Sequence, residues 1–152
     1  MLTVLQVAAY IMSRYYTTNN IKMDEMKLHK LLYFAQRESY IQNDTPLFNE
    51  RFEAWQYGPV MVCVREAYAL DGFGEVPNDD VLKPYMNTFD SVFDFYANRS
   101  SWTLSMLSHA ETSWQKARSG YSDNATNCHV QIDNNDIRED ANIIKSRRIK
   151  LN

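Results

Sequence analysis

The sequence predicts a mainly α-helical protein: a compact single-domain helical bundle of about six to seven helices, with at most a small β element near residues 51–57 and 129–132. Three observations lead to this prediction. Apolar residues recur at spacings of three and four along most of the chain, which is the period of one helix face. Hydrophobic residues make up 45% of the 152 positions and aromatic residues 13%, so the chain can form a core and is not disordered. No repeat or linker divides it, so residues 1–152 are expected to form one domain.

The first helix is predicted from about Val4 to Tyr16. Its apolar residues follow the spacing of one helix face and are Val4, Val7, Ala8, Ile11, Met12 and Tyr15. Thr3 followed by Gln6 has the form of a capping box, in which each side chain accepts from the backbone N–H of the other residue. The polar stretch TTNN at 17–20 is expected to end this helix.

The second helix is predicted to begin after Asp24, a favourable N-cap residue, and to end near Ile41. Its core stripe consists of Leu28, Leu31, Leu32 and Ala35. Tyr33 and Phe34 widen the apolar arc well beyond about 100°, which indicates a helix covered on more than one side. The wetter face of this helix is expected to consist of Lys27, Lys30, Gln36 and Arg37.

Residues 51–57 show a weak alternation of side chains, which favours a short extended segment. Pro59 is expected in the first turn of the next helix, where the missing N–H of proline is harmless. That helix is indicated by an apolar stripe of Val60, Met61, Val64, Ala67 and Tyr68.

The rest of the chain is expected to be mainly helical, with loops and one extended segment between its helices. Residues 71–80 hold two glycines and a proline and are predicted to form a loop, after which Pro84 opens a helix. Ser101 is expected to cap a helix over 102–111, and another helical stretch follows around 114–118. Residues 129–132 are expected to be extended, and a final helix ends in a basic tail.

The net charge of the chain limits the classes of partner that can be expected. The formal net charge is −3, from 16 Lys and Arg against 19 Asp and Glu, so the basic surface of a nucleic-acid binder is missing. No apolar stretch approaches the roughly 20 residues of a membrane-spanning helix, and no signal peptide is recognisable. We therefore expect a cytoplasmic protein with no nucleic-acid partner, no membrane contact, and reduced thiols at Cys63 and Cys128.

Motifs of catalysis and metal binding are missing from the sequence. It contains no G-x-G-x-x-G, P-loop, H-E-x-x-H or C-x-x-C pattern, so we expect no cofactor, no metal site and no enzymatic activity. One alternative stays open, a small hydrolase that uses His109 with Glu111 or a serine, with a possible pocket at His109 and Trp114. Ser108 and His109 point about 100° apart on a helix, so they do not form a nucleophile–base pair locally.

Large aromatic residues exceed what a helical core requires. They include Trp55, Tyr57, Trp102 and Trp114. Most of them are expected to be buried, but Trp and Tyr also dominate the hot spots of protein interfaces. One or two of them at the surface would therefore mark a protein-binding patch.

Three sequence blocks carry a family resemblance. They are MKLHKLLYFAQ (26–36), PLFNERFEAWQYGPV (46–60) and LSMLSHAETSWQKAR (104–118). In order and spacing they resemble the Panacea domain family, the SocA-like antitoxins, which are also met as GepA-type phage-associated proteins. His29 stands where the family usually has Gln, and Ser108 where it usually has Thr. These two departures weaken any role that depends on those side chains.

The resemblance implies a mainly helical fold and an antitoxin that neutralises a cognate toxin by direct protein–protein binding. The toxin is expected to be encoded by an adjacent gene. The alternative is a proteolytic adaptor that delivers the toxin to an ATP-dependent protease such as ClpXP. Some members carry an extra DNA-binding segment, and we expect none here.

The resemblance also suggests where a partner binds. Lys27, Lys30 and Tyr33 are expected to frame a surface shared with the turn formed by Trp55, Tyr57, Gly58 and Pro59. Rigid aromatic residues beside a Gly-Pro turn give a preorganised contact that loses little entropy on binding. The alternative interpretation is that these residues build the fold.

Overall fold

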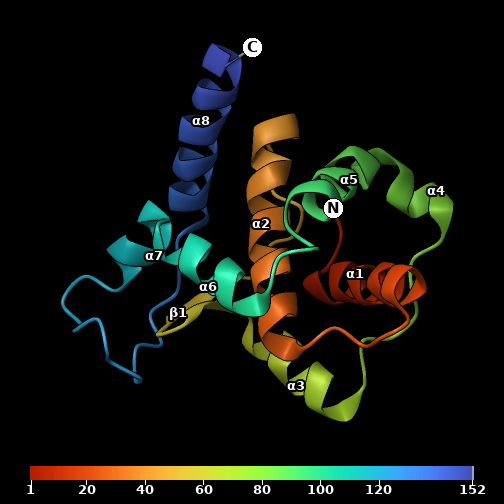
Figure 1. The fold of residues 1–152 in the computed structure, drawn as a ribbon, viewed down its shortest axis with the longest axis horizontal. Helices are drawn as coiled ribbons and strands as arrows, with labels where there is room; N and C mark the ends of the chain where they lie inside the picture. The colour runs from red at the N-terminus through yellow and green to blue at the C-terminus, as the bar shows by residue number, and fades with distance from the viewer. Residues whose placement is uncertain (152) are drawn as a thin grey trace.

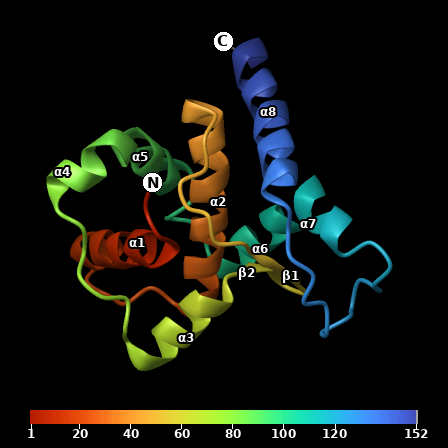
Figure 2. The same ribbon diagram turned by 180° about the vertical axis from the view of Figure 1, so that it is seen from behind.

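Helix α2 (Glu25–Asn43) is the central element of the computed structural model, which describes residues 1–151 (Figure 1). On one side of it lie α1 (Val4–Asn19), α4 (Asp79–Leu82), the 3-10 turn η1 (Lys83–Tyr85) and α5 (Met86–Phe95). On the other side lie α6 (Ser101–His109), α7 (Thr112–Ala117) and α8 (Asn134–Leu151). Figure 2 shows the same division from behind, with α3 (Val62–Leu70) near one end of α2. The prediction of a mainly helical protein with a small β element is confirmed.

Local sequence explains both ends of α1. The predicted capping box is present, because Thr3 Oγ1 accepts from the Gln6 N–H and Gln6 Oε1 accepts from the Thr3 N–H. The helix continues to Asn19 instead of ending near Tyr16. The Thr17 and Thr18 hydroxyls donate to carbonyl oxygens one turn earlier, so the TTNN stretch is compatible with a helix.

The expected wetter face of α2 is wrong, because its polar residues are buried. These residues are Lys27, Lys30, Gln36 and Arg37. The helix is covered on all sides between residues 27 and 41, so no face of this stretch is left for solvent. A buried polar group needs a hydrogen-bond partner, and here distant backbone and side-chain atoms supply it.

Two of these side chains connect α2 to the loops around it. Lys27 Nζ donates to the Ala97 carbonyl oxygen at 3.0 Å. Gln36 binds the loop after α2 twice, since its Nε2 donates to Phe48 O and its Oε1 accepts from Leu47 N–H. Polar residues of α2 therefore position segments that have no regular structure of their own.

A two-stranded antiparallel hairpin follows, formed by β1 (Glu53–Trp55) and β2 (Gly58–Val60). The expected position of Pro59 in the first turn of the next helix is wrong, because it lies in β2 opposite Ala54. Ala54 N–H donates instead to Val130 O on its other side, so the strand pair does not require an N–H from Pro59. The expected extended segment at 129–132 contains an isolated bridge between Gln131 and Glu53.

Two predicted helix starts differ from the structure. Helical structure begins at α4, capped by Asn78, and so precedes Pro84 instead of starting there. The N-cap of α6 is Ser100 and not Ser101, because Ser100 Oγ accepts from the Thr103 N–H. The sequence offers two adjacent serines, and only the contacts of the folded chain distinguish them.

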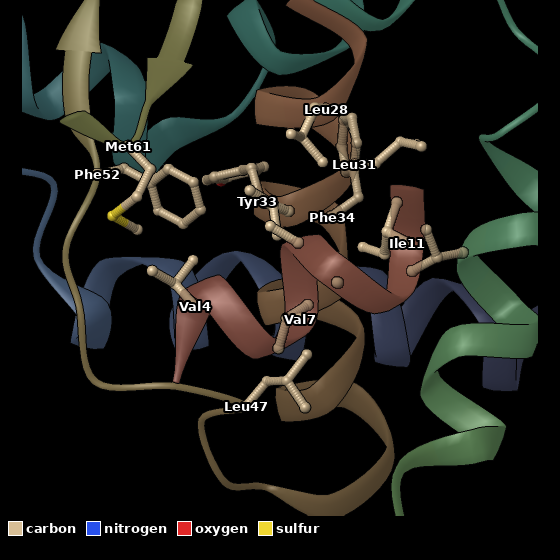
Figure 3. Packing of buried hydrophobic residues seen from close by; sticks show 14 of the residues in the cluster. Val4, Val7, Ile11, Leu28, Leu31, Tyr33, Phe34, Leu47, Phe52 and Met61 are labelled. Atoms are coloured by element: carbon tan, nitrogen blue, oxygen red, sulfur yellow. The ribbon is translucent and has the colours of Figure 1, made fainter. Parts of the chain in front are cut away.

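One connected hydrophobic core joins the helices to the hairpin. Figure 3 shows Val4, Val7 and Ile11 of α1 packed toward α2, with Tyr33 beside Phe52. The rings of Tyr33 and Phe52 meet edge to face, with their centroids 5.6 Å apart. Because Phe52 immediately precedes β1, this contact anchors the hairpin to the centre of the protein. None of the helices in residues 1–151 is long and apolar enough to cross a membrane.

Candidate functional site

Exposed aromatic side chains lie where the hairpin meets α6. Tyr57 at the hairpin tip is 48% exposed, and Trp102 in the first turn of α6 is 59% exposed. Their ring centroids are 6.1 Å apart. Met106, one turn further along α6, is 55% exposed. We call Trp55, Tyr57, Trp102 and Met106 the aromatic face.

The hairpin tip is held tightly against α6. Ser105 Oγ donates a 2.6 Å hydrogen bond to the Tyr57 carbonyl oxygen. Gly58 has a φ of +114°, which L-residues with a side chain rarely adopt, and a Cβ atom there would overlap Ser108 and the aliphatic end of Lys30. These contacts fix the backbone of Tyr57, so its ring is presented on a rigid support.

Trp55 belongs both to the support and to the aromatic face. Its carbonyl oxygen accepts a 2.8 Å hydrogen bond from Trp114 Nε1, which links β1 to α7. Its half-buried ring has the Arg65 guanidinium above it at 5.4 Å and the His129 ring at its edge. A cation over an indole ring is favourable, so the ring is held in place.

A cavity of about 260 Å³ opens beside Trp55 and Tyr57. We call it the hairpin pocket; its lining includes Met26, Lys30, Trp55, Tyr57, Val60 and Arg65. At its edge the Arg65 guanidinium donates to Glu25 Oε2 at 2.9 Å. The buried Lys30 Nζ donates to the Pro59 carbonyl oxygen at 3.0 Å. Burial lowers the pKa of Lys30 to about 7, and Asp24 and Glu25 partly counteract that effect.

Three residues predicted to frame a binding surface are buried, so they do not form an exposed frame for it. They are Lys27, Lys30 and Tyr33. The Tyr33 hydroxyl shares a 2.6 Å hydrogen bond with Ser113 Oγ, and burial raises the pKa of this phenol. Of the three, only Lys30 reaches the hairpin pocket.

The predicted turn comes together as one unit, but only part of it is exposed. Gly58 and Pro59 are buried, while Tyr57 is exposed and Trp55 is half-buried. Trp102 was identified from the sequence as one of the large aromatic residues, but it was not assigned to the binding site. Its spacing of four from Met106 is the signal that could have placed both on one outer face of α6.

The contacts of His29 explain how a histidine can stand where the family usually has Gln. Its Nδ1 accepts a 3.2 Å hydrogen bond from the Met61 N–H, and its Nε2 lies 3.1 Å from Glu25 Oε2. Because Nδ1 is an acceptor, the ring is neutral with its proton on Nε2. Burial, with smaller effects from Lys30 and Arg65, lowers its pKa to about 3. An amide oxygen of Gln could accept the same bond, so the position is structural.

The rings of His109 and Trp114, predicted to line a possible pocket, stack on each other with their centroids 4.4 Å apart. The other residues of the hydrolase alternative are engaged elsewhere. Ser105 Oγ donates to Tyr57 O, and Ser108 Oγ donates to Ser105 O. Glu111 forms a buried ion pair with Arg37. Among residues 1–151 no group of three or more His, Cys, Asp or Glu side chains could hold a metal ion.

Fold and site together define a small helical domain that presents rigid aromatic side chains at a hairpin–helix junction. The chain belongs to the family described as "Antitoxin SocA-like, Panacea domain", which matches residues 28–115. It is similar to Antitoxin SocA of Caulobacter vibrioides (strain NA1000 / CB15N), with 32% identity over 68 residues. That match covers 45% of this chain and 36% of the relative. No solved structure matches the chain.

The family match includes the whole aromatic face. Residues 28–115 run from the first turn of α2 through the hairpin and α6 into α7. The predicted resemblance is confirmed by this match. The elements that hold Tyr57 and Trp102 in place therefore belong to the part of the chain that defines the family.

Proposed function

We propose that this protein is an antitoxin that neutralises a cognate toxin by binding it directly through the aromatic face. It acts stoichiometrically, without catalysis and without a cofactor. Membership of the antitoxin family supports a toxin partner. The observation that carries the proposal is the exposed pair of Tyr57 and Trp102 on a rigid backbone.

Physical properties of this pair suit a protein interface. Tyr and Trp are enriched among the residues that contribute most to binding free energy. Because the Tyr57 carbonyl is bound by Ser105 and Gly58 is closely packed, the hairpin loses little entropy when a partner binds. Met106 extends the same patch along α6 and offers an adaptable apolar surface.

Co-expression tests the proposal. The chain is expressed with the protein encoded by the adjacent gene, and growth and co-purification are measured. We expect restored growth and a stable complex. Restored growth without a complex, and only when an ATP-dependent protease such as ClpXP is present, would favour the adaptor alternative. The absence of a toxic neighbour would contradict the antitoxin role.

Variants then test the aromatic face. A Tyr57→Ala/Trp102→Ala double variant should keep its helical circular dichroism and lose at least about 30-fold in toxin affinity, since a single hot-spot residue contributes about 2 kcal/mol or more. The matched control is Tyr16→Ala, because Tyr16 is 56% exposed and lies on α1, across α2 from the face. Equal affinities of the two variants would place the interface elsewhere.

A further inference from the structure

Lys30 is a buried lysine with unused hydrogen-bond donors. The residue is 1% exposed, and its Nζ donates to the Pro59 carbonyl oxygen. An ammonium group carries three N–H donors. Within residues 1–151 no carboxylate oxygen lies within 4.0 Å of this nitrogen. A buried ammonium without a counter-ion is unfavourable, so an anion that reaches it would be bound strongly.

Lys27 provides a contrast on the same helix. It is also buried, but its Nζ donates to Ala97 O and lies 5.0 Å from the centroid of the Tyr15 ring. Lys27 does not line the hairpin pocket, whereas Lys30 does. Variants of these two residues therefore distinguish the loss of a buried lysine from the loss of a charge at the pocket.

The walls of the hairpin pocket determine what can approach Lys30. Met26, Val60 and the rings of Trp55 and Tyr57 present mainly apolar surface. Arg65 adds a second cation at the edge, paired with Glu25. The volume of about 260 Å³ suits one side chain or a small fragment rather than a larger cofactor. The complementary ligand is an anionic group on an apolar stem.

We propose that the hairpin pocket binds a carboxylate of the toxin carried on an apolar stem, with Lys30 Nζ as its counter-ion and Trp55 and Tyr57 beside the stem. The source of the carboxylate rests on the proposed function. Charge-assisted hydrogen bonds to a carboxylate occupy the free donors of Lys30. The pocket then adjoins the aromatic face, so both belong to one contact surface.

Binding of this kind is coupled to protonation of Lys30. Its lowered pKa leaves the group partly neutral near pH 7, and a carboxylate in the pocket favours the charged form. The other charged or titratable groups around it are Asp24 at the N-cap of α2, Glu25 and His29 on α2, Tyr57 on the hairpin, Arg65 on α3 and His109 on α6. His29 stays neutral at this pH, so it does not supply the proton. Binding at pH 7.5 should therefore take up a proton.

Hydrocinnamate, an aryl carboxylate, is a suitable probe, and its primary amide is the neutral control. We expect the acid to shift the amide signals of Tyr57 and Gly58 in a saturable way in a ¹H–¹⁵N NMR titration. The amide should bind at least about tenfold more weakly, because a hydrogen bond to a charged group contributes about 1.5 kcal/mol or more. Lys30→Met should lose affinity for the acid by the same factor, and Lys27→Met should not. Equal binding of the two probes, or no saturable shift, would overturn the inference.

Calorimetry of the unmodified protein keeps the test independent of whether Lys30→Met folds. In two buffers of different ionisation enthalpy, the heats of hydrocinnamate binding should differ and indicate proton uptake at pH 7.5. Identical heats would contradict the role of Lys30. Failure of the probe overturns the pocket and leaves the co-expression result intact. Failure of co-expression overturns the proposed function and removes the toxin as the source of the carboxylate.

Discussion

Gly58 and the hydroxyl group of Ser108 lie so close together that a Cβ atom at position 58 would overlap Ser108 Oγ. The same Cβ would lie 2.7 Å from Lys30 Cε. Glycine is therefore required at this position for two reasons, its φ of +114° and the lack of space. The hairpin tip can approach α6 only because residue 58 has no side chain.

Replacement of Gly58 should destabilise the protein strongly. Gly58→Ala is expected to lower the free energy of unfolding by about 3 kcal/mol or more, the sum of left-handed strain and overpacking. Gly120→Ala is the control, since Gly120 has a φ of +91° but no atom within 4 Å of its Cβ position. That variant should lose only about 1–2 kcal/mol. Urea unfolding measures both, and equal losses would mean that the close contact with Ser108 has no energetic effect.

The buried pair of Arg37 and Glu111 should be sensitive to loss of one partner. Glu111→Ala leaves the Arg37 charge buried and is expected to reduce stability by about 3–5 kcal/mol. Arg138→Ala removes an exposed ion pair with Asp44 and should reduce it far less, because solvent screens exposed charges. Chemical denaturation of both variants provides the comparison. Similar losses would show that burial of Arg37 does not determine its contribution.

Stability should fall in acid because His29 is held neutral. The pKa of His29 is about 3 in the folded protein and near 6.5 when unfolded, so the unfolded chain binds the extra proton between these values. Its contribution is complete above pH 6.5 and decreases as the pH falls toward 3, by up to roughly 1.4 kcal/mol per pH unit. His29→Gln should lack this component. Unfolding curves measured from pH 7 to pH 4 test it, and parallel pH profiles of the two proteins would be the contrary result.

One arginine of the C-terminal helix, Arg148, should contribute strongly to the stability of the protein. Arg148 forms two hydrogen bonds to the carboxylate of Glu38, a side chain that is 0% exposed. Arg148→Ala leaves this carboxylate buried and unpaired, and we expect a loss of about 3 kcal/mol. Arg147→Ala removes the neighbouring exposed arginine and should change stability by less than about 0.5 kcal/mol. A thermal melt that does not distinguish the two variants would contradict the role of this pair.

Sequence periodicity predicted the helices well because most of them have one apolar face. It failed at α2, where Lys27 and Lys30 are buried like the leucines beside them. The partners of these lysines are carbonyl oxygens of Ala97 and Pro59, and no local pattern identifies them. A helix that is covered on all sides must bury its polar residues, and the pattern alone cannot indicate how they are satisfied.

The candidate site was predicted only in part, again because contacts that the local sequence does not show decide where its side chains lie. Tyr57 was assigned from its place beside a Gly-Pro turn, and it is exposed as expected for a binding residue. Trp102 was not assigned, because whether α6 turns it outward depends on how Leu104 and Ser108 pack inward. Pro59 was misplaced because its partner Ala54 in β1 is bonded on its other side to Val130 O, a contact that is not visible in the local sequence.

The bond between Glu38 and Arg148 spans 110 residues of chain, and it has a consequence for synthesis on the ribosome. When α2 emerges, Lys27, Arg37 and Glu38 still lack partners that are encoded much later. Contacts of such long range form slowly, because the loop between them must close first. The side of α2 that carries Glu38 can therefore be covered only after α8 has been made.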